Sequence, residues 1–307
     1  MPASIHQSQI AGNRWDPGQY LAFADHRLRP ALELLSRVPP ANPQVIYDLG
    51  CGTGQVTRMI AERWPAARVY GRDNSPQILQ QAAATPGSVT WIQADIADWQ
   101  PPEAPDLIYS NATLHWVAGH NELFPRLLRL LPPGGLLAVQ MPLSWDAPSH
   151  RLMRETLANG GPGGRPPGSP KQPHATATAV DAPSHRLMRE TLANGGPGGR
   201  PLGSDKLHQA TATAWVASAA DYYDLLADTA RSLDIWETEY LQVLEGDDPV
   251  LEWVKGTGLR PILNGLADDE RDLFLTAYRE RLRRAYPRRA DGRTLYPFRR
   301  LFMIAAM

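Results

Sequence analysis

The sequence of 307 residues predicts a doubly wound α/β fold with a seven-stranded, mostly parallel sheet, a helical cap and C-terminal additions. Three observations support this prediction. Short apolar runs alternate with helical segments between residues 45 and 142, as in parallel strands joined by helices. A glycine-rich turn follows the first apolar run, and acidic residues end the next two. Two long runs rich in aromatic and β-branched residues come late in the chain and supply the last two strands.

Each element is expected from its own residue pattern. Residues 1–14 form a loose tail, and residues 15–307 form a single domain with cap helices at about 247–290. The expected strands are 45–47, 68–73, 89–96, 106–111, 135–141, 233–244 and 295–306. The expected helices are 30–38, 55–64, 149–157, one that begins at residue 221, 249–255 and 268–286.

The glycine-rich turn, Asp48–Gly54, is the most informative motif. It reads Asp-Leu-Gly-Cys-Gly-Thr-Gly and lies between an apolar strand and a helix. Glycines at alternate positions let the backbone approach a ligand with no Cβ in the way. The first turn of the helix behind them offers free N–H groups. The motif therefore predicts a binding site for a nucleotide-type cofactor.

The spacing of the motif separates two cofactor classes. The dinucleotide fingerprint is G-x-G-x-x-G, whereas here the third glycine comes one residue early and Gln55 takes its place. A carboxylate at Asp48 would repel a pyrophosphate but suits the ammonium group of S-adenosylmethionine. The pattern D-x-G-x-G-x-G resembles motif I of the class I S-adenosylmethionine-dependent methyltransferases. An NAD-dependent dehydrogenase is correspondingly disfavoured.

Acidic residues at the ends of the second and third strands support the same prediction. Asp73 follows Gly54 by 19 positions, where an acid meets ribose hydroxyls in doubly wound nucleotide sites. Asp95 ends the third predicted strand and is expected to accept a hydrogen bond from the adenine amine. The cofactor residues expected from these motifs and from the resemblance are Tyr20, Arg27, Asp48, Gly50, Cys51, Gly52, Gly54, Asp73, Asn74, Asp95, Ile96 and Asn111.

Composition excludes several function classes. The net charge of −1 gives no reason to expect a nucleic-acid or anionic-membrane partner. The single cysteine, Cys51, excludes an intramolecular disulfide framework and fits a reducing compartment. The first 14 residues have no apolar core typical of a leader, and no apolar run has the length of a membrane span. A cytoplasmic location is therefore expected, while the oligomeric state is not predicted.

A duplication interrupts the second half of the chain. Segments 146–180 and 181–215 agree at 29 of 35 aligned positions. Each copy carries one helical piece followed by a tract rich in glycine and proline, which cannot bury much apolar surface. One copy is expected to pack on the domain and the other to form a non-functional insert. A regulatory or dimer-swapped role is the alternative.

Further segments narrow the resemblance to the trans-aconitate 2-methyltransferase family. The segments that carry it cover nearly the whole chain in order and are Trp15–Leu21, Arg29–Leu35, Ser110–Trp116, Leu137–Pro142, Thr257–Pro261 and Pro297–Phe302. The family has no 35-residue duplication. The resemblance implies S-adenosylmethionine-dependent formation of a monomethyl ester on a small polycarboxylate.

The chemistry of such a reaction sets what the chain must supply. A carboxylate is already ionised at neutral pH, so no catalytic acid or base is expected. Arginine binds carboxylates through two parallel hydrogen bonds, and segment 260–300 holds 11 arginines and no lysine. The substrate-binding candidates are His115, Trp116, Arg260, Arg299 and Arg300. Methylation of another small metabolite, such as a quinone precursor or phenol, and a non-catalytic cofactor-binding scaffold are the alternatives.

Overall fold

The computed structural model describes residues 28–39, 42–143, 147–159, 216–255 and 259–307. Two predicted cofactor residues, Tyr20 and Arg27, lie outside these ranges, as do the N-terminal tail and the whole second copy of the duplicated segment. The side chain of Arg260 also lies outside the described part. In the described residues, no helix combines the length and the apolar character needed to cross a membrane.

The elements alternate along the chain as predicted. The strands are β1 Val45–Leu49, β2 Arg68–Asp73, β3 Thr90–Gln93, β4 Leu107–Asn111, β5 Leu136–Pro142, β6 Ser232–Leu244 and β7 Thr294–Ala306. The helices near the sheet are α2 Arg29–Arg37, α3 Gln55–Arg63, α4 Pro76–Ala83, the short 3-10 helix η1 Leu114–Trp116, α5 His120–Arg129 and α9 Ala219–Leu226. The remaining helices are α6 Pro148–Asn159, α10 Pro249–Lys255, α11 Arg260–Gly265 and α12 Asp268–Ala285.

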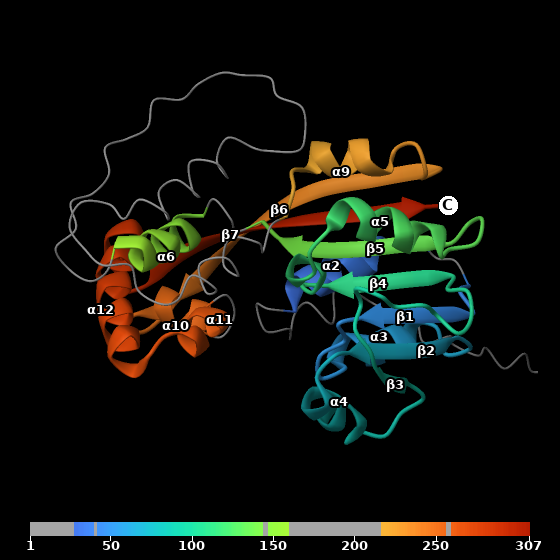
Figure 1. Ribbon diagram of the computed structural model, residues 1–307, viewed down its shortest axis with the longest axis horizontal. Coiled ribbons are helices and arrows are strands. Elements are labelled where there is room, and N and C mark those ends of the chain that lie inside the picture. Colours follow the sequence, from blue (N-terminus) through green and yellow to red (C-terminus); the bar gives the residue numbers. More distant parts are fainter. Residues whose placement is uncertain (1–27, 40–41, 144–146, 160–215, 256–258) are drawn as a thin grey trace, which may run out of the picture.

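The seven strands form one sheet in the order β3-β2-β1-β4-β5-β7-β6 (Figure 1). The first five are parallel, and β7 enters antiparallel between β5 and β6. The fold class predicted from the sequence is therefore confirmed. Reversal of strand order beside β1 opens a crevice at the carboxyl ends of the parallel strands, which is where open α/β sheets bind ligands.

Two apolar cores cover the two faces of the sheet. On one face α2 and α3 pack Leu34, Leu35 and Ile60 against residues such as Tyr109 and Phe302. On the other face α5 and α9 form the second core, which contains Leu123, Phe124, Leu127, Tyr222, Leu226, Val139 and Met303. Since neighbouring residues of a strand face opposite sides, these cores assign every central strand residue to one face.

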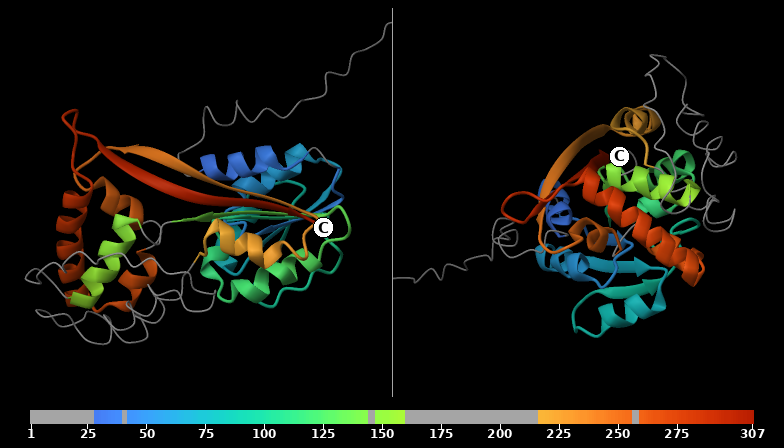
Figure 2. Two further views of the ribbon diagram at one scale, coloured as in Figure 1. Left: turned by 90° about the horizontal axis from the view of Figure 1, so that it is seen from above. Right: turned by 90° about the vertical axis from the view of Figure 1, so that its left-hand side faces the viewer.

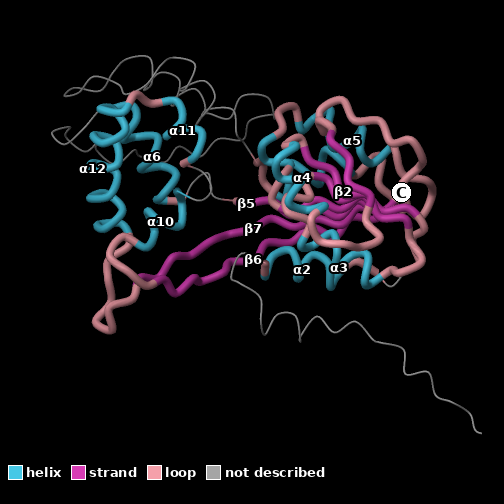
Figure 3. Tube along the Cα trace, turned by 90° about the horizontal axis from the view of Figure 1, so that it is seen from below, coloured by secondary structure: helices cyan, strands magenta, loops and turns pink. Residues whose placement is uncertain are grey.

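The last two strands extend past the sheet as a long hairpin (Figures 1 and 2). At its far end α6, α10, α11 and α12 form a separate helical lobe, called here the cap (Figure 3). Its core combines Tyr296 and Phe298 of β7 with Leu157 of α6 and Phe274 and Tyr278 of α12. The hairpin thus joins the cap to the sheet through continuous strands.

The first copy of the duplicated segment contributes α6 to the cap. The backbone N–H of Ser149 donates to the Tyr286 hydroxyl at 3.0 Å, and the Tyr278 hydroxyl donates to the Ser149 carbonyl at 2.9 Å. Met153 and Leu157 are buried in the cap core. Which copy packs on the domain was left open by the sequence, and within the described residues it is the first.

One strand is shorter than predicted. We expected the third strand to reach Asp95, but β3 ends at Gln93. The Ala94 N–H still donates to the Asp73 carbonyl at 3.1 Å, whereas the Asp95 carboxylate accepts from the Ala97 N–H at 2.9 Å. This local hydrogen bond turns the chain away from the sheet and places Asp95 just beyond the strand.

Glu33 fastens α2 to the hairpin. Its carboxylate accepts hydrogen bonds from the Trp236 indole at 2.9 Å, the Thr238 hydroxyl at 2.6 Å and the Tyr240 hydroxyl. Burial raises the pKa of Glu33, but these three donors and nearby Arg37 outweigh it and hold the pKa below its ordinary value. The ionised carboxylate is therefore the form that stabilises the fold.

We expect Glu33→Ala to lower the free energy of unfolding by about 2–3 kcal/mol at pH 7, because it leaves several donors without their charged acceptor. A carboxylate with a depressed pKa stabilises above its unfolded pKa and loses that effect as the pH falls through the folded pKa. Urea unfolding at pH 7 and below pH 4.5 should therefore show a penalty that shrinks in acid. A penalty independent of pH would contradict a charge-based role.

Candidate functional site

The glycine-rich loop has the backbone geometry that the motif predicts. Gly50, Gly52 and Gly54 all have positive φ, at 74°, 55° and 77°. A Cβ on Gly52 would meet nothing within 4 Å, so the backbone there is open to a ligand. A Cβ on Gly50 would lie 2.1 Å from Thr113, and one on Gly54 would lie 2.2 Å from Trp91. Two glycines are therefore required by close packing, and the middle one by backbone conformation alone.

Asp73 holds this loop from the end of β2. One carboxylate oxygen accepts from the Gly52 N–H at 3.1 Å, and the other accepts from the Ser75 N–H at 3.0 Å. Each carboxylate oxygen has a second lone pair that remains for a ligand hydroxyl. Asp73 thus holds the loop in shape and can still accept a hydrogen bond from a ligand at the edge of the loop.

Asp48 lies beneath the loop and is almost fully buried, with 2% of its surface exposed. Its carboxylate accepts from the Thr57 hydroxyl at 2.6 Å. Burial raises the pKa of Asp48 to about 7, and the nearby charge of Asp73 adds to the rise. A buried carboxylate without a cation favours binding of a positively charged ligand group, because that group would stabilise its ionised form.

Cys51 is a packing residue of the loop. Its side chain is 8% exposed. Burial raises the pKa of the thiol above its ordinary value, and the charges of Asp48 and Asp73 raise it further. The thiol therefore stays protonated at neutral pH and has no nucleophilic character.

The other predicted cofactor residues differ in burial. Asn74 and Asp95 are exposed and lie just beyond the ends of β2 and β3. The side chain of Ile96 is buried in the core under α5. Trp91 of β3, which the motif did not suggest, packs over Gly54 and Gly71. Its signal in the sequence is weak, since an aromatic residue in a strand is ordinary.

The connection after β4 joins the loop to a second group of residues. The Thr113 hydroxyl donates to the Gly50 carbonyl at 3.2 Å and lies 3.1 Å from the Asn111 carbonyl. Ala112, which lies between Asn111 and Thr113 in the chain, has a φ of 52°, and this is unusual for a residue other than glycine. Such strain is concentrated at ligand-binding sites, where the surrounding structure holds it in place.

Four residues at the carboxyl edge of the sheet carry buried polar atoms with no hydrogen-bond partner in the described structure. These atoms are Asn111 Oδ1, His115 Nδ1, both amide atoms of Gln140, and Arg300 Nε. Asn111 pairs with Gln140 across β4 and β5, and Arg300 pairs with Pro142 at the end of β5. The strand alternation places Asn111, Gln140 and Arg300 on the same face as Tyr109, Ala138 and Phe302. We call these four residues the polar edge.

Arg300 and His115 set the charge of the polar edge. Arg300 is 9% exposed and stacks 4.1 Å from the Phe298 ring, and no acid pairs with it in the described residues. Burial lowers the pKa of Arg300 to about 10, so it remains charged at neutral pH. Burial and the Arg300 charge lower the pKa of His115 to about 3, which keeps the imidazole neutral.

The remaining substrate candidates are not brought to this place together. Arg299 is exposed and forms an ion pair with Glu237. Because it neighbours Arg300 on a strand, it faces the opposite side of the sheet. Trp116 is 52% exposed and its ring lies 4.7 Å from that of His115.

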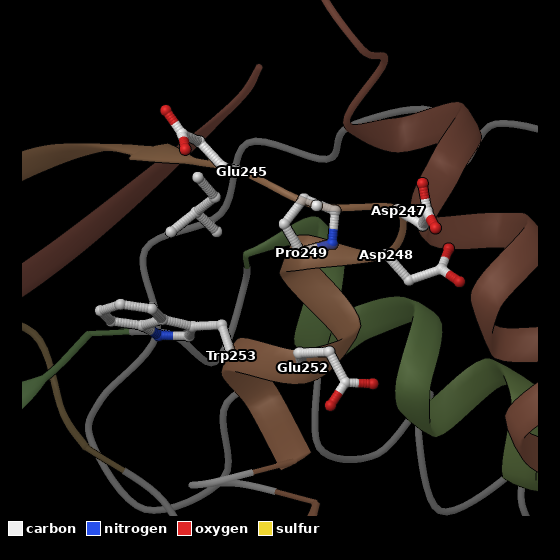
Figure 4. A pocket seen from close by; sticks show the side chains of 8 residues that line it. Glu245, Asp247, Asp248, Pro249, Glu252 and Trp253 are labelled. Carbon is white, nitrogen blue, oxygen red and sulfur yellow. The ribbon is translucent and has the colours of Figure 1, made fainter. Parts of the chain in front are cut away.

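Many of the other C-terminal arginines form surface ion pairs. Arg279 and Arg283 both contact Asp248, and Arg293 contacts Glu245. Asp248 and Glu245 line a pocket where the hairpin meets α10, together with Leu244, Gly246, Asp247, Pro249, Glu252 and Trp253 (Figure 4). Much of the arginine content of this segment therefore belongs to the surface of the cap and the hairpin, and burial is what distinguishes Arg300.

The geometry combines two neighbouring sites. The glycine-rich loop, Asp48 and Asp73 suit a nucleoside with a cationic group, and the polar edge suits an anion with several acceptors. Gln140 was not among the residues expected from the sequence. An amide within the otherwise apolar run Leu136–Met141 was the available signal.

Comparisons with known proteins show which family the chain resembles. Residues 46–135 match the family described as a methyltransferase domain. A trans-aconitate 2-methyltransferase of Azoarcus sp. (strain BH72) is 44% identical over 291 residues, covering 95% of this chain and 98% of the relative. The trans-aconitate 2-methyltransferase of Pseudomonas aeruginosa PAO1 is 42% identical over 294 residues, covering 96% of this chain and 94% of the relative.

A solved structure supports the fold. The YcgJ protein of Bacillus subtilis superposes with a TM-score of 0.52 at 10% identity, covering 92% of this chain and 98% of that protein. At this identity the likeness extends to the fold alone.

Asp48→Asn should stabilise the ligand-free protein at neutral and alkaline pH. The pKa of Asp48 is about 7 in the folded protein, against an ordinary value of 3.8 for an exposed carboxyl. Between these two values the unfolded chain loses the proton and the folded protein keeps it, so the carboxyl lowers the stability of the fold increasingly as the pH rises. The amide keeps an acceptor for Thr57 and removes the buried charge. We expect the difference in Tm between variant and wild type to grow from pH 4 to pH 7 and then level off. A variant that is less stable than wild type at pH 8 would contradict this.

Proposed function

We propose, because this chain belongs to the trans-aconitate 2-methyltransferase family, that it transfers a methyl group from S-adenosylmethionine to a carboxylate of trans-aconitate. The observation that carries the proposal is Arg300, a buried guanidinium at the sheet edge without an acidic partner in the described residues. Removing a charge from water without a counter-charge is strongly unfavourable. An anionic ligand supplies that counter-charge.

The described residues fit S-adenosylmethionine. Gly52 leaves room for the ligand, Asp73 presents free lone pairs for ribose hydroxyls, and the buried carboxylate of Asp48 suits the ammonium group. Asn74 and Asp95, which follow the ends of β2 and β3, would contact the nucleoside. When bound, the cofactor supplies an activated methyl group on its sulfonium.

The chain's own contribution to the reaction is positioning. A substrate carboxylate is ionised at neutral pH and attacks without a general base. Arg300 would hold one of the non-reacting carboxylates, and neutral His115 can donate or accept a hydrogen bond without adding charge. Fixing reacting groups in line is worth roughly 7–11 kcal/mol of the barrier.

The alternative substrates fit the polar edge less well. A neutral phenol or quinone precursor would leave the Arg300 charge without a partner, and so would a non-catalytic scaffold that binds the cofactor alone. The single cysteine and the small-molecule substrate favour the cytoplasm as the location. The proposed experiment is a methyl-transfer assay with trans-aconitate, other polycarboxylates and a phenol, with the ester identified by mass spectrometry.

Arg300→Met should reduce kcat/KM for trans-aconitate by roughly 100-fold, the equivalent of about 3 kcal/mol for a charge-assisted contact. Affinity for S-adenosylhomocysteine should stay within about twofold, because Arg300 lies away from the glycine-rich loop. Steady-state kinetics and calorimetric titration measure the two effects separately.

Arg299→Met is the matched comparison, since it makes the same change at the neighbouring position on the opposite face. We expect at most a small change in kcat/KM there, because Arg299 is exposed and paired with Glu237. A larger effect at Arg299 than at Arg300 would move the substrate to the other face. Undiminished methylation in Arg300→Met would refute the assignment of that arginine.

A further inference from the structure

Gln140 is the most completely unpartnered polar side chain in the described part of the chain. It lies on the inner strand β5, two residues before the carboxyl end of that strand, and is 0% exposed. Neither its amide nitrogen nor its amide oxygen has a hydrogen-bond partner among the described residues. Its backbone carbonyl, in contrast, accepts from the Ala112 N–H at 2.9 Å.

Such a residue disfavours the ligand-free fold. A buried donor or acceptor without a partner loses its hydration and gains nothing in return. An apolar side chain of similar volume would pack the same place without this loss. The neighbouring residues of β5 are apolar, as in Ala138, Val139 and Met141. The amide is therefore best explained by a ligand that completes its hydrogen bonds.

The surroundings of Gln140 indicate which ligand. Asn111 lies opposite it on β4, and Phe302 lies opposite it on β7. Arg300 is two residues from Phe302 on the same face, roughly 7 Å along the strand. An anionic group bound at Arg300 would bring its neighbouring groups within reach of the amide.

We propose that Gln140 is a specificity-determining residue that hydrogen-bonds a second non-reacting carboxylate of the substrate. This inference rests on the proposed function. The amide N–H donates to the carboxylate, and the amide oxygen is left for a bound water. Arg300 and Gln140 together then hold two carboxylates while the third is methylated, so the site selects tricarboxylates over dicarboxylates.

The alternative is that Gln140 has only a structural role. The two explanations differ in what Gln140→Met does to substrate binding. Gln140→Met keeps the volume but removes both unpartnered groups, so Tm should stay equal or rise. If Gln140 binds substrate, the same variant should weaken trans-aconitate binding. A structural role alone gives no loss of binding.

Gln242→Met is the matched control. Gln242 is a second buried glutamine, 1% exposed, with an unpartnered amide oxygen. It lies on β6 opposite Tyr296, four residues from the Arg300 position and toward the cap. We expect its replacement to leave the kinetics for trans-aconitate unchanged.

The test measures binding and turnover with three ligands. These are trans-aconitate, glutaconate and mesaconate, the last two each lacking a different carboxylate of trans-aconitate. Gln140→Met should weaken trans-aconitate binding and kcat/KM by about tenfold to a hundredfold, the range for a hydrogen bond to a charged group. For the dicarboxylate that lacks the recognised carboxylate, the variant and wild type should be equal.

Three outcomes are informative. An equal loss with all three ligands, or no loss with trans-aconitate, would overturn the role of Gln140 while leaving the proposed function intact. Wild-type protein that forms no methyl ester of trans-aconitate would refute the proposed function instead. Calorimetric titration of trans-aconitate in the presence of S-adenosylhomocysteine still decides the role of Gln140 in that case, because it requires no turnover.

Should Gln140→Met fold poorly, Gln140→Glu replaces the donor by an acidic group and should weaken binding further.

Discussion

The antiparallel pairing of β7 between β5 and β6 is the constraint on which the rest of the structure depends. Its register sets Arg300 opposite Pro142, at the carboxyl end of β5 and beside the polar atoms of Gln140 and Asn111. The same strand continues outward with Tyr296 and Phe298, which form part of the cap core. A shift of one residue would turn Arg300 to the other face and place Arg299 at the polar edge.

The polar side chains that are at least half-buried divide into those with hydrogen-bond partners and those without. The Glu33 carboxylate accepts from Trp236, Thr238 and Tyr240, and it fixes α2 against the hairpin. Gln140, His115 and Arg300 have polar atoms without partners in the described residues, and all lie at the edge where parallel sheets bind ligands. Glu33 thus stabilises the fold, whereas the polar atoms at the edge are left for a ligand.

Much of the fold could be predicted because hydrophobic runs, glycine positions and strand-end acids are local signals. All seven strands and the loop at Gly50–Gly54 are found where the sequence indicated them. The limit appears where a side chain's role depends on distant pairing. Arg299 and Arg300 are equal candidates by sequence, but only the β5–β7 register shows that Arg300 is buried at the edge while Arg299 is exposed. Gln140 lies in the same category, because its orphaned amide becomes visible only when its neighbours in space are known.

The long hairpin has a mechanical consequence. β7 has 13 residues and is roughly 43 Å long, and its inner half is fixed by pairing on both sides. Arg300 is the outermost residue of β7 that pairs with β5, and beyond it β7 pairs only with β6 as the hairpin extends to the cap. A strand moves least where it is paired on both sides. A movement of the cap would therefore displace Thr294 much more than Arg300. In the proposed site, a ligand held by Arg300 would therefore be displaced little by movement of the cap.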